Sequence, residues 1–517
     1  MCRIPRKTST YISRTLTILA VCVSVSLLLS CSHRPSPNTL VMIIESSPIN
    51  LDPRVGQDGQ SERIDELIFD ALLTRDEHFN VAPGLAERWE IPDPHTYVFH
   101  LHQGVKFHNG HPLTSRDVKW TFDSLLQKKI RSTKAATYRF VDRIDTPDDY
   151  TVVFHMKEPD ATLLWNLSEG AIGIVPFGSG EEMSRHPVGS GPFRFVSAEQ
   201  DKEVVVECND DYWGGKPKIE RVHFAVVPDP TTRALELRKG SADIAINALT
   251  PDTVLTLERE PKLQVLRAPG TIVAYLAFNT RDPILKDTRV RQAIAYAIDR
   301  RPMIHYLWRD FVRPAASLLP PESWANDSNV VQYDYNPERA RQLLDAAGHP
   351  EINGVRFRLT VKTSTEETPR LQAAVLQQQL REVGIALDIR TFEFATFLSD
   401  VTRGEFQLYT LRWIGGNEDP DIFEVFHSSK FPPNGYNRGY YANPTLDALI
   451  DQGRREPDQN KRREIYGEIQ RTVAQDEPYI NLWYLDNVLV ASRRMRNLTL
   501  NSSGNYGFLK AAELTAP

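Results

Sequence analysis

Hydrophobic and polar residues alternate most regularly between residues 355 and 412. The pattern predicts strand 357–362, helix 369–383 ended by Gly384, strand 387–392, helix 394–403 and strand 406–411. This order favours parallel βαβ units and therefore an α/β lobe. Ligands of such sheets bind beyond the carboxyl ends of the strands. The loop after the last strand, RWIGGNEDPD at 412–421, is thus the first candidate for ligand contact.

Other segments carry clear signals for strands, helices and helix ends. Apolar residues at helical spacing predict a helix over 61–73, and alternation predicts strands 96–101 and 150–156, which are candidate neighbours. Thr114 and Asp117 have the spacing of a capping box, and Asp287 is placed to cap a second helix. Asn336-Pro337 begins a third helix that Gly348 ends.

The loop at 412–421 contains side chains suited to ligand contact. Trp413 offers a flat apolar wall, although core packing explains a Trp here equally well. Gly415 and Gly416 allow a backbone to approach a ligand closely, and a tight turn is the alternative explanation.

Size and charge limit the classes of protein that remain. The 517 residues are 41% hydrophobic and 25% charged, which is ordinary globular composition, and two or three lobes are expected. The net charge of -6 argues against a nucleic-acid partner, which requires a basic face. The four cysteines are Cys2, Cys22, Cys31 and Cys208, so a chain that begins at Cys31 keeps two cysteines, Cys31 and Cys208. Acylation of Cys31 would leave Cys208 alone, without an intramolecular disulfide.

The first 31 residues have the pattern of an export signal. A basic start precedes the apolar stretch 16–29, which is short for a membrane span. The stretch ends Leu28-Leu29-Ser30-Cys31 and resembles a bacterial lipobox, which implies cleavage before Cys31 and lipid on its sulfur. Residues 31–39 are then a polar tether. We expect a membrane-anchored lipoprotein facing the periplasm or cell exterior, and the alternative is an uncleaved signal anchor.

A series of short motifs then resembles the family 5 extracellular solute-binding proteins, which bind dipeptides, oligopeptides or nickel for ABC importers. The motifs keep their order and spacing over most of the chain. They are LDP at 51–53, PGLAERW at 83–89, YVFHLHQGVKFHNG at 97–110, VGSGPF at 188–193, NDDYWGGKP at 209–217, GSADI at 240–244, FN at 278–279, RVRQAI at 289–294, AIDR at 297–300 and DP at 419–420.

The resemblance implies a fold of the periplasmic-binding-protein type II kind: two α/β lobes that close on a ligand, plus an additional α/β domain. The implied parts are a signal peptide (1–30), lobe I (40–52, 188–274 and 488–517), domain II (53–187) and lobe III (275–487). Contacts from both lobes would favour the closed state, which the importer recognises. The expected partners are a peptide or other small solute and the permease and ATPase subunits of an ABC importer, with the protein itself a monomer.

The resemblance also implies ligand-contacting residues outside the loop. Tyr484 matches a pocket-lining aromatic of oligopeptide binders, and Tyr275 is placed similarly near a crossover between lobes. Ser46, Ser47 and Asn50 precede a motif where relatives present an extended strand to the ligand backbone. Each of these residues has the alternative of being an ordinary, internally bonded residue.

The sequence departs from the peptide-binding pattern at both ends of the expected ligand. The Asp that pairs with the ligand ammonium aligns with Gly416, and Glu418 or Asp419 substitutes for it only if the loop path differs. The stretch 363–367 lacks the Arg that dipeptide binders use for the carboxylate. A buried charge without a partner is costly, so the departures favour a longer peptide, a capped peptide or a non-peptide ligand.

Enzymatic and metal-binding motifs are weak in this sequence. Gly189-Ser190-Gly191 lacks the spacing of a nucleophile elbow, and neither a phosphate loop nor an H-E-x-x-H motif occurs. His100, His102, His108 and His111 make a metal site conceivable, but His108 belongs to a family motif, and we expect neither a metal nor a cofactor. Binding of a metal chelate, opine or sugar-like solute, or ligand sensing without transport, remains as an alternative function.

Overall fold

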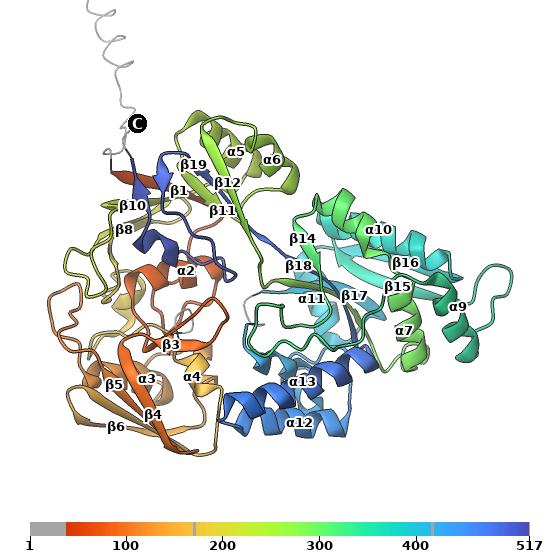
Figure 1. Ribbon diagram of the computed structural model, residues 1–517, viewed down its shortest axis with the longest axis horizontal. Coiled ribbons are helices and arrows are strands. Elements are labelled where there is room, and N and C mark those ends of the chain that lie inside the picture. The colour runs from red at the N-terminus through yellow and green to blue at the C-terminus, as the bar shows by residue number, and fades with distance from the viewer. Residues whose placement is uncertain (1–37, 169–171, 415–417, 516–517) are drawn as a thin grey trace, which may run out of the picture.

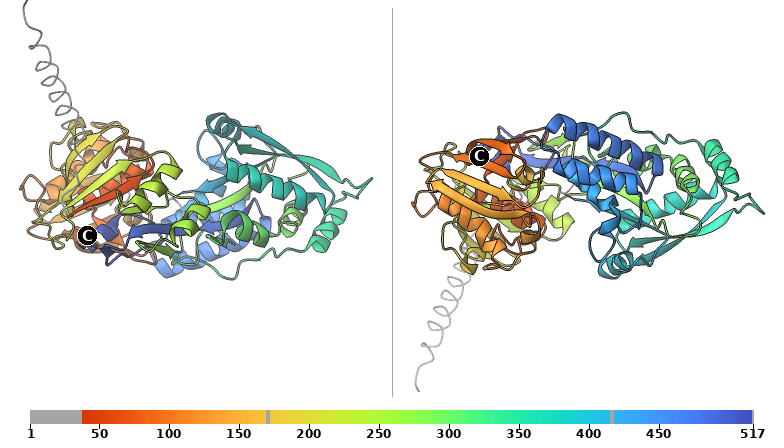
Figure 2. Two further views of the ribbon diagram at one scale, coloured as in Figure 1. Left: turned by 90° about the horizontal axis from the view of Figure 1, so that it is seen from above. Right: turned by 90° about the horizontal axis from the view of Figure 1, so that it is seen from below.

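The computed structural model describes residues 38–168, 172–414 and 418–515 (Figure 1). Two α/β lobes lie side by side along the long axis of the molecule, and a domain built on an antiparallel sheet lies against the first lobe (Figures 1 and 2). Within these residues no helix has the length and apolar character needed to cross a membrane. The expected fold class, two lobes with an extra domain, is confirmed.

The first lobe is built on a seven-stranded sheet in the order β12-β19-β11-β1-β10-β9-β8. Its central strand β1 runs parallel to β10 and β11, which places three carboxyl ends at one edge. The strands are β1 Thr39–Ile44, β8 Phe193–Glu199, β9 Glu203–Cys208, β10 Arg221–Val226, β11 Ile244–Ile246, β12 Leu263–Ala268 and β19 Asn487–Ser492. Further elements are α2 Gly59–Ile68, α5 Pro230–Lys239, α6 Pro251–Leu257, β20 Met495–Arg496, η6 Gly507–Lys510 and β21 Glu513–Leu514.

The additional domain contains a four-stranded antiparallel sheet in the order β4-β5-β7-β6. The predicted neighbours at 96–101 and 150–156 are confirmed as β5 and β7. Its elements are β2 Leu73–Arg75, β3 Val81–Pro83, β4 Ala86–Asp93, β5 Thr96–Leu101, α3 Ser115–Leu126, η1 Thr133–Ala136, β6 Val141–Asp148, β7 Thr151–Met156, α4 Leu163–Asn166 and η2 Glu181–Ser184. The capping box of Thr114 and Asp117 is present at the start of α3.

The second lobe is built on a six-stranded sheet in the order β14-β18-β13-β17-β15-β16. Its strands are β13 Val273–Phe278, β14 Val312–Pro314, β15 Phe357–Ser364, β16 Ile385–Phe392, β17 Leu408–Trp413 and β18 Tyr479–Leu485. Its helices are α7 Thr288–Tyr296, α8 Arg300–Pro302, η3 Met303–Leu307, α9 Pro337–Ala346, α10 Glu367–Arg381, α11 Phe394–Arg403, η4 Pro420–Phe426, η5 Ser428–Lys430, α12 Pro444–Arg455 and α13 Gln459–Asp476.

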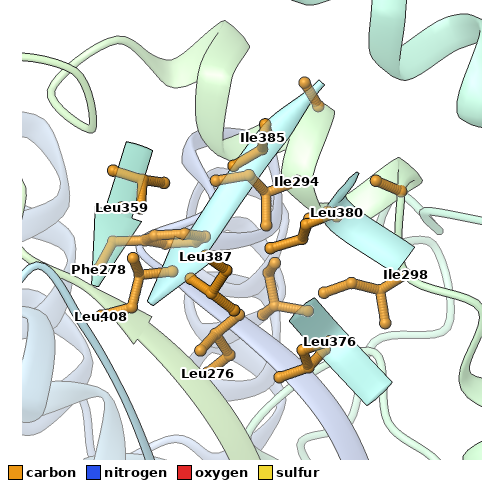
Figure 3. Close-up of a cluster of buried hydrophobic side chains, with 14 of the residues drawn as sticks. Leu276, Phe278, Ile294, Ile298, Leu359, Leu376, Leu380, Ile385, Leu387 and Leu408 are labelled. Carbon is orange, nitrogen blue, oxygen red and sulfur yellow. The ribbon is translucent and has the colours of Figure 1, made fainter. Parts of the chain in front are cut away.

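The predicted βαβ units are confirmed in this lobe. β15 pairs in parallel with both β16 and β17, and α10 and α11 connect the three strands. Gly384 has φ +83°, which suits a glycine at the end of α10. Both faces of this sheet are covered: on one, side chains of the strands meet those of α7 and α10 (Figure 3), and on the other they meet those of α11, α12 and α13. The residues labelled in Figure 3 are Leu276, Phe278, Ile294, Ile298, Leu359, Leu376, Leu380, Ile385, Leu387 and Leu408.

Two helix ends and one helix length show how far local signals reach. Asp287 and Asn336 accept backbone N–H groups at the starts of α7 and α9, as predicted. The helix predicted over 61–73 ends at Ile68 instead, because Phe69 has extended backbone angles (φ -118°, ψ 147°). Ala71 and Leu72 are still buried, so the apolar pattern continues into an irregular segment that packs against the core.

The chain passes between the two large sheets twice, from β12 to β13 and from β18 to β19. These connections touch: a Cβ on Gly270 would lie 2.2 Å from the carbonyl oxygen of Leu485. Arg313 Nε donates to Asp486 Oδ1 at 2.9 Å and its Nη2 to Gly270 O at 3.2 Å, so one side chain binds both connections. Such paired short connections are typical of a hinge between lobes. The residue boundaries of the lobes stay a prediction.

Candidate functional site

Exposed apolar side chains follow the carboxyl ends of parallel strands in both large sheets. In the second lobe Phe394, two residues after β16, is 47% exposed, and Ile414, directly after β17, is 66% exposed. In the first lobe Ile49 lies five residues after β1 and is 82% exposed. Ligands of α/β sheets bind at this edge of the strands, so these exposed side chains are candidates for ligand contact.

Trp413 lies at the last position of β17, at the end of a row of stacked aromatic rings. Its ring centre lies 6.0 Å from that of Tyr275, with 19° between the planes, and Tyr275 stacks on Tyr479 at 4.5 Å. Trp413 is half-buried, whereas Tyr275 is 1% exposed. Trp413 can therefore present part of its ring to a ligand, and Tyr275 supports that ring from beneath.

Tyr484 is buried on β18 and uses its hydroxyl inside the protein. Its Oη lies 2.6 Å from Ser317 O and 2.7 Å from Leu319 O. Burial raises the pKa of Tyr484 above its ordinary value. A direct ligand contact by Tyr484 stays a prediction, and the contacts in this structure are those of a residue that orders the neighbouring loop.

Three candidates follow β1 in the first lobe. Ser46 is exposed, and Ser47 Oγ accepts from the backbone N–H of Asp201 at 2.7 Å. Asn50 Oδ1 accepts from the N–H of Asp52 at 2.9 Å, and the Asn50 N–H donates to Ser61 Oγ at 3.1 Å. The segment is thus tied to the start of α2, which leaves Ser46 with a side chain open to solvent. The ligand roles of all three stay predictions.

Glu418 is a buried carboxylate that joins two separate parts of the molecule. Arg75 Nη1, on β2 of the additional domain, donates to Glu418 Oε2 at 2.7 Å, and Thr271 Oγ1 lies 3.4 Å from Oε1. Burial raises the pKa of Glu418, and the positive charge of Arg75 opposes that rise. Any ligand ammonium would therefore compete with Arg75 for this carboxylate.

Asp419, the second acidic candidate, is also paired internally. Arg462 of α13 donates from Nη2 to Asp419 Oδ1 at 3.1 Å and from Nη1 to Oδ2 at 3.3 Å. Asp419 Oδ1 also accepts the Asp421 N–H at 2.8 Å, at the start of η4. Both oxygens are thus engaged within the second lobe. The proposed substitution of Asp419 for the amine-binding Asp stays a prediction.

Three of the predicted residues, Gly415, Gly416 and Cys31, lie outside the described residues. In the stretch that lacks the expected Arg, Thr363 and Ser364 are buried, and Glu366 and Glu367 are exposed at the start of α10.

The four histidines between residues 100 and 111 have different partners. His100 Nε2 lies 3.3 Å from Glu90 Oε1, and the ring centre of His102 lies 5.0 Å from that of Trp213. His108 Nε2 lies 3.0 Å from Gly191 O, and burial lowers the pKa of His108 to about 4. His111 is exposed. Over the described parts of the chain, no group of three or more His, Cys, Asp or Glu residues is placed to hold a metal ion.

Arg438 is a residue of this region that the sequence patterns did not indicate. It lies between η5 and α12, and its guanidinium carbon is 5.8 Å from the ring centre of Trp413 and 5.1 Å from that of Tyr436. The surrounding segment, NGYNRGYY at 434–441, has no helix or strand period. Only the tertiary fold brings this cation to the aromatic row.

Comparison with known proteins matches residues 80–432 to the middle part of the bacterial extracellular solute-binding proteins, family 5. Di/tripeptide-binding protein 2 of Pseudomonas aeruginosa is 29% identical over 88% of this chain and 91% of its own length. Heme-binding protein A of Haemophilus influenzae is 28% identical over 92% of each chain. The structure of the oligopeptide-binding protein AppA from Bacillus subtilis, in complex with a nonapeptide, has 25% identity and a TM-score of 0.75 over 92% of this chain and 99% of AppA.

Proposed function

Since the chain belongs to the family 5 bacterial extracellular solute-binding proteins, whose members bind solutes and are not enzymes, we propose that it captures a peptide for an ABC importer. The peptide is longer than a free dipeptide. The two lobes close on it, and the closed form delivers it to the permease and ATPase subunits.

The proposal rests on the exposed apolar side chains at the carboxyl edges of both large sheets. Ile49 in one lobe and Phe394 and Ile414 in the other lie where ligands of α/β sheets bind. The hinge through Gly270 and Leu485 allows these edges to approach each other. An extended peptide suits such a surface, because backbone pairing tolerates many side chains and apolar walls receive some of them.

Export and anchoring are part of the same proposal. The basic start, the apolar stretch and Cys31 support a lipoprotein at the membrane surface, and we expect it to work as a monomer. Delivery to a permease requires the binding protein to stay near the membrane, and an acylated Cys31 with a short tether provides this.

Mass spectrometry of the natural ligand tests the function directly. The protein is purified from its export compartment without refolding, denatured, and the released small molecules are sequenced. We expect peptides of three or more residues. A sugar-like solute, an opine or a metal chelate as the principal released species would contradict peptide binding. Uptake of the identified peptide after deletion of the gene separates transport from sensing, because a sensor would leave uptake unchanged.

A further inference from the structure

Arg438 has a guanidinium that forms no ion pair with a carboxylate in the described protein, and its polar neighbour there is the hydroxyl of Tyr275. Three buried arginines of the second lobe contrast with it: Arg291 and Arg300 donate to several backbone carbonyls, and Arg462 binds Asp419. Arg438 is half-buried and instead lies beside the rings of Trp413 and Tyr436. A guanidinium has five N–H donors, and partial burial makes unused donors costly.

Further hydrogen-bond donors lie around this cation. Trp413 Nε1 is buried and has no hydrogen-bond partner in the described structure, and the buried Tyr275 hydroxyl has Arg438 and Tyr409 within reach. The hydroxyls of Tyr409 and Tyr479 lie 3.5 Å apart, and the rings of Tyr275 and Tyr409 pack edge to face at 6.0 Å. Burial raises the pKa of Tyr275, Tyr409 and Tyr479, and the charge of Arg438 opposes the rise in each case. The positive charge of Arg438 therefore acts on all three hydroxyls.

This set of groups matches one kind of ligand chemistry. A guanidinium, an indole N–H and phenolic O–H groups all donate hydrogen bonds, and a carboxylate accepts several at once. The neighbouring faces of Trp413 and Tyr436 can receive a flat or apolar group attached to that carboxylate. A cationic ligand would be repelled here.

We propose that Arg438 binds a carboxylate of the captured solute beside the Trp413 ring, so that the protein prefers ligands with an acidic group next to an apolar one. This inference rests on the proposed function and names the ligand class. The carboxylate is either the C-terminal group of a peptide or an acidic side chain. Because Glu418 and Asp419 are paired with Arg75 and Arg462, a ligand ammonium has no matching anchor among them. Ligands with a blocked amine fit best.

Calorimetric titration of matched probes tests the role of Arg438. The first pair is N-acetyl-Ala-Ala-Phe and its C-terminal amide, and N-acetyl-Ala-Glu-Phe-amide isolates a side-chain carboxylate. Phenylacetate and phenylacetamide form a pair that is not a peptide. In the wild type we expect each carboxylate that uses the site to bind about 10- to 100-fold more tightly than its amide. In Arg438→Gln this ratio should fall to nearly 1.

Two further variants separate recognition from stability. Arg438→Lys keeps the charge without the bidentate geometry and should retain part of the preference. Arg339→Gln is the matched control, because Arg339 is exposed on α9 and the variant loses the same charge. It should leave the preference unchanged. Melting temperatures within a few degrees of the wild type would show that all variants fold.

The outcomes decide the inference and the proposed function separately. A preference that survives in Arg438→Gln, or no carboxylate preference in any pair, overturns the role of Arg438. Peptides that bind equally well as acids and amides would leave peptide capture intact. An Arg438-dependent preference for phenylacetate without any peptide binding would support the carboxylate site and refute peptide capture.

Discussion

Arg75 and Glu418 are 343 positions apart in the sequence, yet their side chains form a 2.7 Å ion pair between the additional domain and the second lobe. The same two parts also meet where Ala161 N donates to Arg454 O at 2.8 Å and Gln459 Nε2 donates to Asn80 Oδ1 at 2.8 Å. The additional domain therefore contacts the second lobe close to the loop that follows β17. This relationship affects both stability and the chemistry open to a ligand.

Breaking the Arg75–Glu418 pair should destabilise the protein unequally from its two sides. Arg75→Met leaves a buried carboxylate without its cation and should cost about 3 kcal/mol in the free energy of unfolding. Glu418→Gln leaves the more accessible Arg75 and should cost about 1.5 kcal/mol. Urea unfolding measures both, and the double variant should cost less than their sum. Arg88→Met is the control, since Arg88 pairs with exposed Glu90 and its loss should cost under about 1 kcal/mol.

Asp421 should make the stability depend on pH near neutrality. Burial raises its pKa to about 7, although the charge of Arg454 opposes the rise. The unfolded chain has an Asp pKa of about 4, so the folded state binds the proton more strongly between these values. The contribution of Asp421 to the free energy of unfolding is therefore full below about pH 4 and is lost as the pH rises to about 7.

Urea unfolding of the wild type and Asp421→Asn from pH 4.5 to 8.5 measures this contribution. As the pH rises, the wild type should lose free energy of unfolding relative to Asp421→Asn. The difference between the two proteins should become constant once the pH is above about 7. A difference independent of pH would show that Asp421 is already ionised in the folded protein at the lowest pH.

Local patterns predicted the second lobe well because its signals are local. The strands and helices from β15 to β17 each have their own period and their own glycine or polar boundary, as at Gly384. The cap at Asp287 depends on neighbouring residues alone. By contrast, the apolar residues Ala71 and Leu72 matched a helical period, but they are buried in an irregular segment between α2 and β2.

The candidate site was less predictable because its chemistry depends on distant partners. The sequence singled out Glu418 and Asp419 as candidate anions, but it could not show that Arg75 and Arg462 lie beside them. It found no Arg in the stretch 363–367, and Arg438 reaches the aromatic row from another segment. Contacts of this kind follow from the tertiary fold rather than from spacing.

Trp413 should report ligand binding by its fluorescence. Its half-buried ring lies beside the guanidinium of Arg438, so a ligand at this position would change the polarity around the indole. Titration with N-acetyl-Ala-Ala-Phe should change the emission of the wild type and of the control Trp213→Phe, but much less that of Trp413→Phe. Trp413→Ala should weaken binding with little loss of stability. A large fall in its melting temperature with unchanged affinity would show a purely structural role.

Cys31 should carry the lipid anchor. Cys31→Ala should move the protein from the membrane fraction to the soluble exported fraction or trap the precursor, and Cys22→Ala should leave its location unchanged. Fractionation with immunoblotting, followed by mass spectrometry of the N-terminal peptide, makes the comparison. Recovery of the intact N-terminus from Met1 on the mature protein would refute the lipoprotein assignment.

Free dipeptides should bind weakly, because a zwitterion enclosed between two lobes needs a partner at each charged end. Arg438 can serve the carboxylate. The ammonium would need Glu418 or Asp419, and each of these is held by an arginine in the structure. Removing Glu418 from Arg75 would leave the guanidinium without its anion, so little net affinity would be gained.

Acetylation of the amine therefore shows whether dipeptides bind weakly because of their unpaired ammonium or because they are short. N-acetyl-Ala-Phe should bind more tightly than Ala-Phe, by about tenfold, because it has no ammonium to desolvate. In Arg75→Met the carboxylate of Glu418 is released, and the affinity for free Ala-Phe should rise relative to its acetylated form. Calorimetric titration of both peptides on both proteins measures the four affinities. Sub-micromolar binding of several free dipeptides to the wild type would overturn the prediction and would mean that Glu418 or Asp419 exchanges its arginine for the ligand.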